Sequence, residues 1–139
     1  MSVEAGQATE PQRADFHGPW WYHAAYGVML TGLVLTFCLG PPLAVTIAIA
    51  VSAVVGYVLT IAFGVVTGIE LRRFRPPVYA LAGAIGGLVL VGLTFGVKVL
   101  VDSTGEAWIA VVAALLVGAG AAWYGWLIDP LLKDREPTA

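Results

Sequence analysis

The sequence predicts an all-α integral membrane protein, a four-helix bundle built from two helical hairpins. Composition is the first reason: of 139 residues, 59% are hydrophobic and 12% are charged, whereas soluble domains carry about 25% charged residues. The spacing of the charges is the second, because no Asp, Glu, Lys or Arg occurs between residues 16 and 69. Two further apolar stretches follow this one, each long enough for a transmembrane helix of about 20 residues.

The tails at the two ends of the chain are polar. Residues 1–19 are acidic and rich in Ala, Gln, Glu and Pro, and they predict a disordered N-terminal tail. This tail lacks the basic segment of a secretory signal, so we expect the first hydrophobic segment to be retained. Residues 130–139 form the C-terminal tail, and residues 20–129 form one transmembrane domain.

Proline and glycine indicate where the first two helices meet. We expect helices over residues 21–39 and 43–69, because the uncharged stretch is long enough for two crossings. Between them lies Gly40-Pro41-Pro42. Glycine can end a helix and proline can begin the next one, so these residues predict a tight turn.

Two more crossings are expected over residues 78–101 and 106–128. A short polar turn separates them, and within it Ser103 and Glu106 have the spacing of a capping box for the fourth helix. Four crossings place both ends of the chain on the same side of the membrane.

Basic residues indicate which side that is. Six of the seven Lys and Arg residues lie in the tails or in the connection at residues 70–75, and only Lys98 approaches the other side. Cytoplasmic loops of membrane proteins carry an excess of basic residues. We therefore expect both termini in the cytoplasm. The Ala-, Val- and Gly-rich composition, with more Arg than Lys, is typical of GC-rich bacteria and favours their plasma (inner) membrane.

Aromatic residues near the expected helix ends mark the two membrane interfaces, because amphipathic rings settle at the level of the lipid headgroups. Lys98 is the one basic side chain inside an expected span, and it precedes Asp102 by four residues. We expect it to reach the interface and to pair with that carboxylate, in preference to contacting a substrate. The predicted interface anchors are Trp20, Trp21, Tyr22, Trp108, Trp123, Trp126 and Lys98.

Small residues recur every fourth position and form rows on which another helix could pack closely. We expect them to pack within the chain, with a seam to a second copy or a partner helix as the alternative. Shorter rows are Ala24, Gly32, Thr36 and Gly40 in the first helix and Ala110, Ala114, Gly118 and Ala122 in the fourth. The main helix-packing candidates are Ser52, Gly56, Thr60, Gly64 and Gly68 in the second helix and Gly83, Gly87, Gly92 and Gly96 in the third.

The remaining polar residues predict no catalytic, metal or cofactor site. His17 and His23 flank the first tryptophans at a spacing that fixes no ligand geometry, so interface polarity is the interpretation. Glu70, Asp102 and Asp129 lie at helix ends that face different sides of the membrane. The single cysteine, Cys38, is expected to be an inert apolar filler.

These observations favour a non-enzymatic accessory or scaffold subunit. Its expected partners are the lipid bilayer and either a second copy or the helices of other membrane proteins. A net charge of −2 offers no basic surface for nucleic acid. A small transporter or channel built as an oligomer of four-span subunits is the alternative, and a membrane-bound enzyme ranks last. No carboxylate lies inside a span, so we expect no proton-coupled transport.

Overall fold

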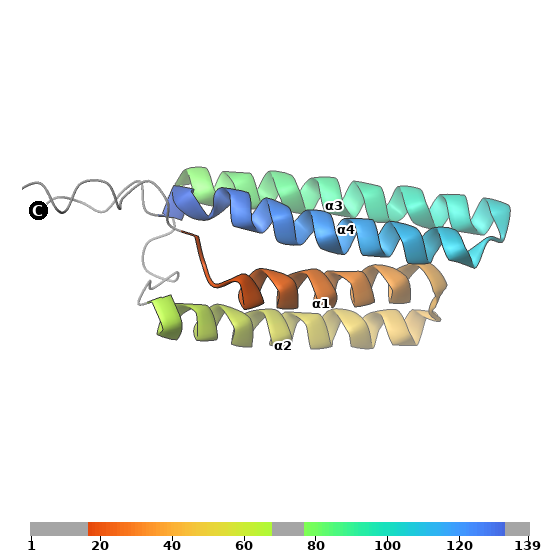
Figure 1. Ribbon diagram of the computed structural model, residues 1–139. Helices are drawn as coiled ribbons and strands as arrows, with labels where there is room; N and C mark the ends of the chain where they lie inside the picture. Colours follow the sequence, from red (N-terminus) through yellow and green to blue (C-terminus); the bar gives the residue numbers. More distant parts are fainter. Residues whose placement is uncertain (1–16, 68–76, 133–139) are drawn as a thin grey trace, which may run out of the picture.

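The computed structural model describes residues 17–67 and 77–132 (Figure 1). Its helices are α1 (Trp20–Leu39), α2 (Pro42–Thr67), α3 (Pro77–Thr104) and α4 (Ala107–Ile128), followed by the short 3-10 helix η2 (Asp129–Leu132). All four α-helices are long and apolar enough to cross a membrane. The predicted all-α fold with four membrane-spanning helices is confirmed. Residues 1–16 and 133–139 of the predicted tails, residues 70–75 and Gly68 lie outside the described residues.

The turn between α1 and α2 forms where it was expected. The backbone N–H of Gly40 donates to the carbonyl oxygen of Thr36 at 2.8 Å and ends α1. Pro42 opens α2, at a position where a missing N–H costs nothing. The carbonyl oxygen of Pro41 accepts the N–H of Val45 at 3.1 Å, which completes the first turn of α2.

The turn between α3 and α4 differs from the prediction. Helix α3 continues to Thr104 and ends at Gly105, whose φ of 73° is the left-handed conformation that glycine adopts freely. Ser103 therefore still belongs to α3, and its hydroxyl donates to the carbonyl of Leu100 at 2.9 Å. Glu106 is the N-cap of α4 and makes no side-chain capping bond. The predicted capping box is wrong because α3 extends beyond residue 101.

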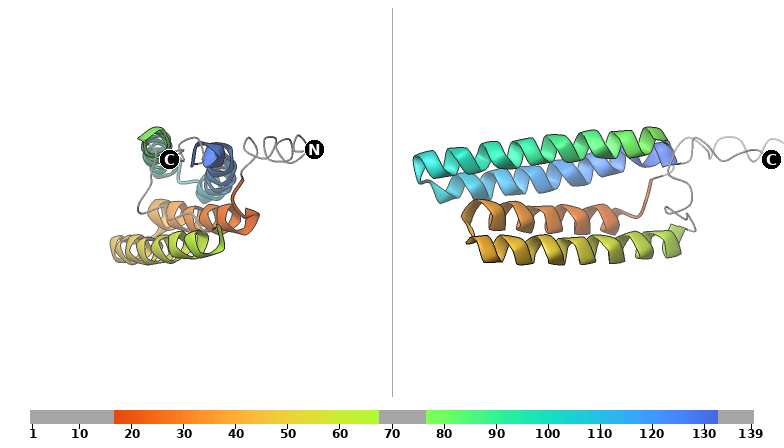
Figure 2. Two further views of the ribbon diagram at one scale, coloured as in Figure 1. Left: turned by 90° about the vertical axis from the view of Figure 1, so that its left-hand side faces the viewer. Right: turned by 180° about the vertical axis from the view of Figure 1, so that it is seen from behind.

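The two hairpins pack together through α1 and α4, which gives the lateral order α2, α1, α4, α3 (Figure 2). Among the described helices α2 approaches only α1, whereas α3 lies against α4 and touches α1 to a small extent. The described beginning of the chain and the end of α4 lie at the same end of the bundle (Figure 1). Both outer helices expose most of their apolar side chains, as lipid-facing helices do.

The core is small and centred on the contact between α1 and α4. Its buried members come from these two helices and from the last turns of α3. Cys38 is one of them, with 5% of its surface exposed, as expected for an apolar filler. The buried apolar cluster comprises Val34, Cys38, Val101, Ala110 and Ala114.

The closest approach of α1 and α4 is between two glycines. A Cβ atom built on Gly27 would lie 2.7 Å from the carbonyl oxygen of Gly118, which is closer than real Cβ contacts. The hydroxyl of Thr31 lies in the same region and donates to the carbonyls of Gly27, at 2.9 Å, and Ala114, at 3.2 Å. At Gly27 and Gly118 the two backbones therefore come close because neither residue carries a Cβ atom.

Of the small-residue rows predicted for α1 and α4, one lies at their interface and the other does not. The α4 row is at the interface, because Ala110, Ala114 and Gly118 are buried. The α1 row is off the interface, since Ala24 and Gly32 are exposed. The residues that α1 does bury are His23, Gly27, Val34 and Cys38. That stripe mixes large and small side chains, so a search for small residues passes over it.

The packing candidates on the outer helix α2 are partly covered. Ser52, Gly56, Thr60 and Gly64 of α2 are half-buried, and a Cβ on Gly56 would lie 3.3 Å from the Tyr26 hydroxyl of α1.

On α3, the predicted packing within the chain is not found. All four of its candidates are exposed, and a Cβ added to any of them would meet nothing within 4 Å; they are Gly83, Gly87, Gly92 and Gly96. A different glycine, Gly86, packs on the ring of Tyr124, whose hydroxyl donates to the Ala82 carbonyl at 2.7 Å. A seam with a second copy or partner stays a prediction.

Candidate functional site

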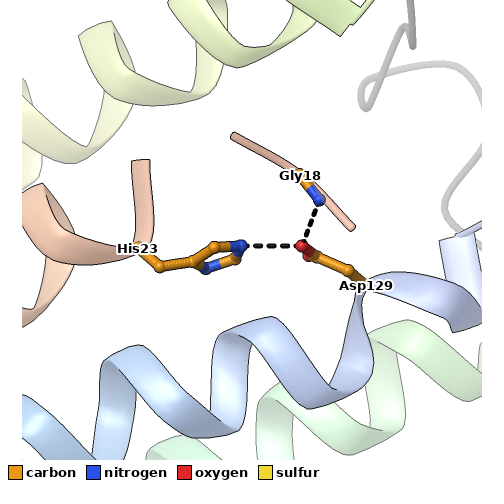
Figure 3. A network of polar contacts seen from close by, with 3 residues as sticks. All are labelled: Gly18, His23 and Asp129. Atoms are coloured by element: carbon orange, nitrogen blue, oxygen red, sulfur yellow. Dashed lines mark hydrogen bonds and ion pairs between the residues drawn. The ribbon is translucent and has the colours of Figure 1, made fainter. Parts of the chain in front are cut away.

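A buried polar cluster joins the beginning of α1 to the end of α4 (Figure 3). Oδ2 of Asp129 accepts the backbone N–H of Gly18 at 2.6 Å and lies 2.7 Å from Nε2 of His23. Only 1% of Asp129 and 7% of His23 is exposed. We refer to Gly18, His23 and Asp129 as the Asp129 cluster.

Local sequence places each member of the cluster. Pro19 is the extended N-cap of α1, so Gly18 precedes the helix and His23 lies just beyond its first turn. Asp129 follows the last residue of α4 and begins η2. Proline at position 130 has no N–H to continue an α-helical ladder, which accounts for the change of helix type at this point.

Glycines make room for the cluster. A Cβ on Gly18 would lie 2.9 Å from Asp129 Oδ2 and 2.5 Å from the ring of Phe63, on α2. A Cβ on Gly125 would lie 2.9 Å from Nδ1 of His23. A larger residue at position 18 would therefore press on the carboxylate and the Phe63 ring, and one at position 125 would press on the imidazole.

Aromatic rings surround the cluster. The ring centroid of Tyr22 lies 5.3 Å from that of His23 and 4.6 Å from that of Phe63, which is itself 1% exposed. His17 stacks on Trp126 with centroids 4.1 Å apart. Tyr22 of α1 and Phe63 of α2 therefore pack beside the cluster.

Asp129 has the partners that a buried carboxyl group needs. A buried carboxylate is costly unless it is paired and hydrogen-bonded, and here the backbone N–H of Gly18 and the Nε2 atom of His23 converge on one oxygen. The carboxylate also lies beside the N-terminus of α1, where the helix dipole stabilises negative charge. No group of three His, Cys, Asp or Glu side chains that could hold a metal ion occurs among the residues searched, which are the described ones.

The interpretation of His23 as interface polarity is wrong, because its ring is buried and paired with Asp129. Asp129 lies at the end of α4 as expected, but it is also buried, which the sequence did not indicate. Their separation of 106 residues explains why local patterns did not connect them. The available signals were a histidine near the start of the first span and an Asp-Pro pair directly after the last one.

The predicted interface anchors differ in exposure, and Trp21 and Tyr22 are half-buried. Lys98 forms the expected ion pair with Asp102, at 3.2 Å, near the opposite end of the bundle, and this pairing is confirmed. Trp20, Trp108 and Trp123 are 78%, 61% and 66% exposed. The role of these residues as interface anchors stays a prediction.

No protein-family model matches the chain, and comparisons with curated proteins and with solved structures give no match either. A function therefore has to be supported by the chain's own geometry. Two features stand out in that geometry: the Asp129 cluster and the exposed glycines of α3.

Proposed function

We propose that this chain is a non-enzymatic accessory or scaffold subunit of the bacterial plasma membrane. In this proposal both termini are cytoplasmic, and the exposed face of α3 docks onto transmembrane helices of other proteins. The six basic residues that share the side of the termini support the orientation. Four apolar helices support the membrane location.

The observation that carries the docking role is the open space over the α3 glycines. Helix α3 lies at one end of the order α2, α1, α4, α3. A Cβ atom added to any of its four candidate glycines would meet no atom within 4 Å. Lipid chains are as apolar as leucine side chains, so the hydrophobic effect does not drive helices together inside a membrane. They associate through close van der Waals packing instead. Such packing is closest where glycines leave a groove without side chains along the helix.

The exposed glycines form two pairs with four-residue spacing, Gly83 with Gly87 and Gly92 with Gly96. Nine residues separate the centres of the pairs, which at 100° per residue places them on opposite faces of α3. The helix can therefore present one groove in each half of its length, and two partner helices can approach it from different sides.

Co-purification tests this role. The tagged full-length chain is isolated in mild detergent from the cells that make it, as wild type, as Gly83→Leu/Gly87→Leu and as Ala84→Leu. Leucine at the glycines fills the groove, so we expect recovery of the partner to fall by about tenfold, the equivalent of 1.4 kcal/mol. Ala84 is exposed on the same helix and provides the control, which should retain the partner.

Equal recovery of every co-purifying protein from all three variants would contradict docking through this face. Loss of self-association in the double-leucine variant, with no other protein present, would assign the face to a second copy of the chain. Uptake driven by an imposed gradient in liposomes that contain the protein alone would replace the accessory role with the transporter alternative.

A further inference from the structure

The Asp129 cluster has a free position for one more proton. Nε2 of His23 contacts Asp129, which leaves Nδ1 as the second ring nitrogen. Nδ1 lies beside Gly125 and is hydrogen-bonded to no residue in the described part of the chain. The ring can therefore gain a proton at Nδ1 while the contact between Nε2 and Asp129 stays in place.

Proton uptake changes the charge of the cluster. With a neutral imidazole and an ionised carboxylate, the buried pair carries one negative charge. After uptake it is an ion pair with no net charge, and its hydrogen bond joins two charged groups. Bonds between charged partners are stronger than bonds between a charged and a neutral group, and a buried charge is stabilised most by a neutralising neighbour.

Described side chains that face the cluster bring no competing charge. Helix α1 contributes Tyr22, α2 contributes Phe63, and the glycine next to Nδ1 comes from α4. On α4, the hydroxyl of Tyr124 donates a hydrogen bond to the Ala82 carbonyl. Among the described residues that precede α1, the titratable group is His17, which is stacked on Trp126. In the described part of α3, the ionisable Lys98 and Asp102 lie near the opposite end.

We propose that His23 and Asp129 form a proton-dependent latch between α1 and α4. Protonation of His23 at Nδ1 tightens the contact between α1 and the end of α4, and loss of that proton loosens it. Histidine is the side chain that proteins commonly use as a proton-dependent switch. The inference does not depend on the docking role of α3.

A double-mutant cycle measures the latch in the full-length chain in detergent. It uses a His17→Gln background, which leaves His23 as the one histidine. Glutamine at position 23 can still donate to Asp129 but cannot gain a proton. We expect His23→Gln to lower the melting temperature more at pH 6 than at pH 8. In the Asp129→Asn background the difference between the two pH values should disappear.

An equal loss at both pH values, or a pH-dependent loss that persists in the Asp129→Asn background, contradicts the latch. A second readout, with the native residues kept at positions 23 and 129, needs neither of these variants to fold. Ring ¹⁵N shifts of labelled histidine should show Nε2 protonated throughout and Nδ1 gaining a proton between pH 8 and pH 5.5. A ring that stays neutral at pH 5.5, or that carries its single proton on Nδ1 at pH 8, overturns the proposal.

Discussion

Replacing Gly118 with leucine is expected to separate α1 from α4 and to lower the melting temperature of the protein in detergent. A Cβ at this position would overlap the Thr31 hydroxyl and would lie 2.6 Å from the carbonyl oxygen of Gly27. Backbone atoms cannot move aside as a flexible side chain can. Overpacking of this kind costs about 1–3 kcal/mol, occasionally more.

Gly120 provides the matched control for this change. It lies two residues further along the same helix, is exposed, and would place a Cβ in open space. Gly120→Leu should therefore melt close to the wild type. If the two variants melt alike, the near-contact of the α1 and α4 backbones is not what holds the hairpins together.

Replacing Asp129 with alanine is expected to have a comparable or larger effect. The substitution removes one oxygen that serves two buried donors, the backbone N–H of Gly18 and Nε2 of His23. Removing one partner of a buried pair typically costs about 3–5 kcal/mol, because the other is left without compensation. Thermal unfolding of the full-length chain in detergent measures the loss.

Asp102→Ala is the control, because Asp102 also pairs with a basic residue but has 59% of its side chain exposed. An exposed ion pair contributes about 0–1 kcal/mol. The loss for Asp129→Ala should therefore clearly exceed the loss for Asp102→Ala. Similar losses would mean that the buried carboxylate has little more effect on stability than the exposed one.

The spacing of charges was enough to predict the fold. Hydropathy locates a helix wherever about 20 apolar residues run together, and turn residues such as Gly40 and Pro42 mark the boundaries. The boundary at residue 101 was placed too early, because Asp102, Ser103 and Thr104 are polar yet still helical. Polarity predicts where the apolar core of the membrane ends, and a helix can continue past that point.

Which helices face each other was only partly predictable. The small residues of α4 identify its contact face, but α1 meets that face with a mixed stripe that includes His23 and Val34. The glycines of α3 show the opposite error, because they form two regularly spaced pairs that pack on nothing in the described part of the chain. Row periodicity identifies a possible contact face but does not say which helix occupies it.

The Asp129 cluster was not predictable from local sequence. Each of its members looks ordinary in context: a glycine and a histidine near the start of a span, and an aspartate just after another. Their contact depends on the ends of α1 and α4 being adjacent, which is a property of tertiary packing. Proximity in space, across more than 100 residues of chain, turns these side chains into a site.

The arrangement of helices is tested most directly by the reactivity of the native thiol. Cys38 is 5% exposed in the core between α1 and α4, whereas its neighbour Leu39 is 48% exposed on the outer face of the same helix. In mild detergent, a maleimide reagent should modify Cys38→Ser/Leu39→Cys quickly and leave the wild-type thiol unmodified until the protein is unfolded. Equally fast modification of both thiols in the folded protein would contradict a core centred on α1 and α4.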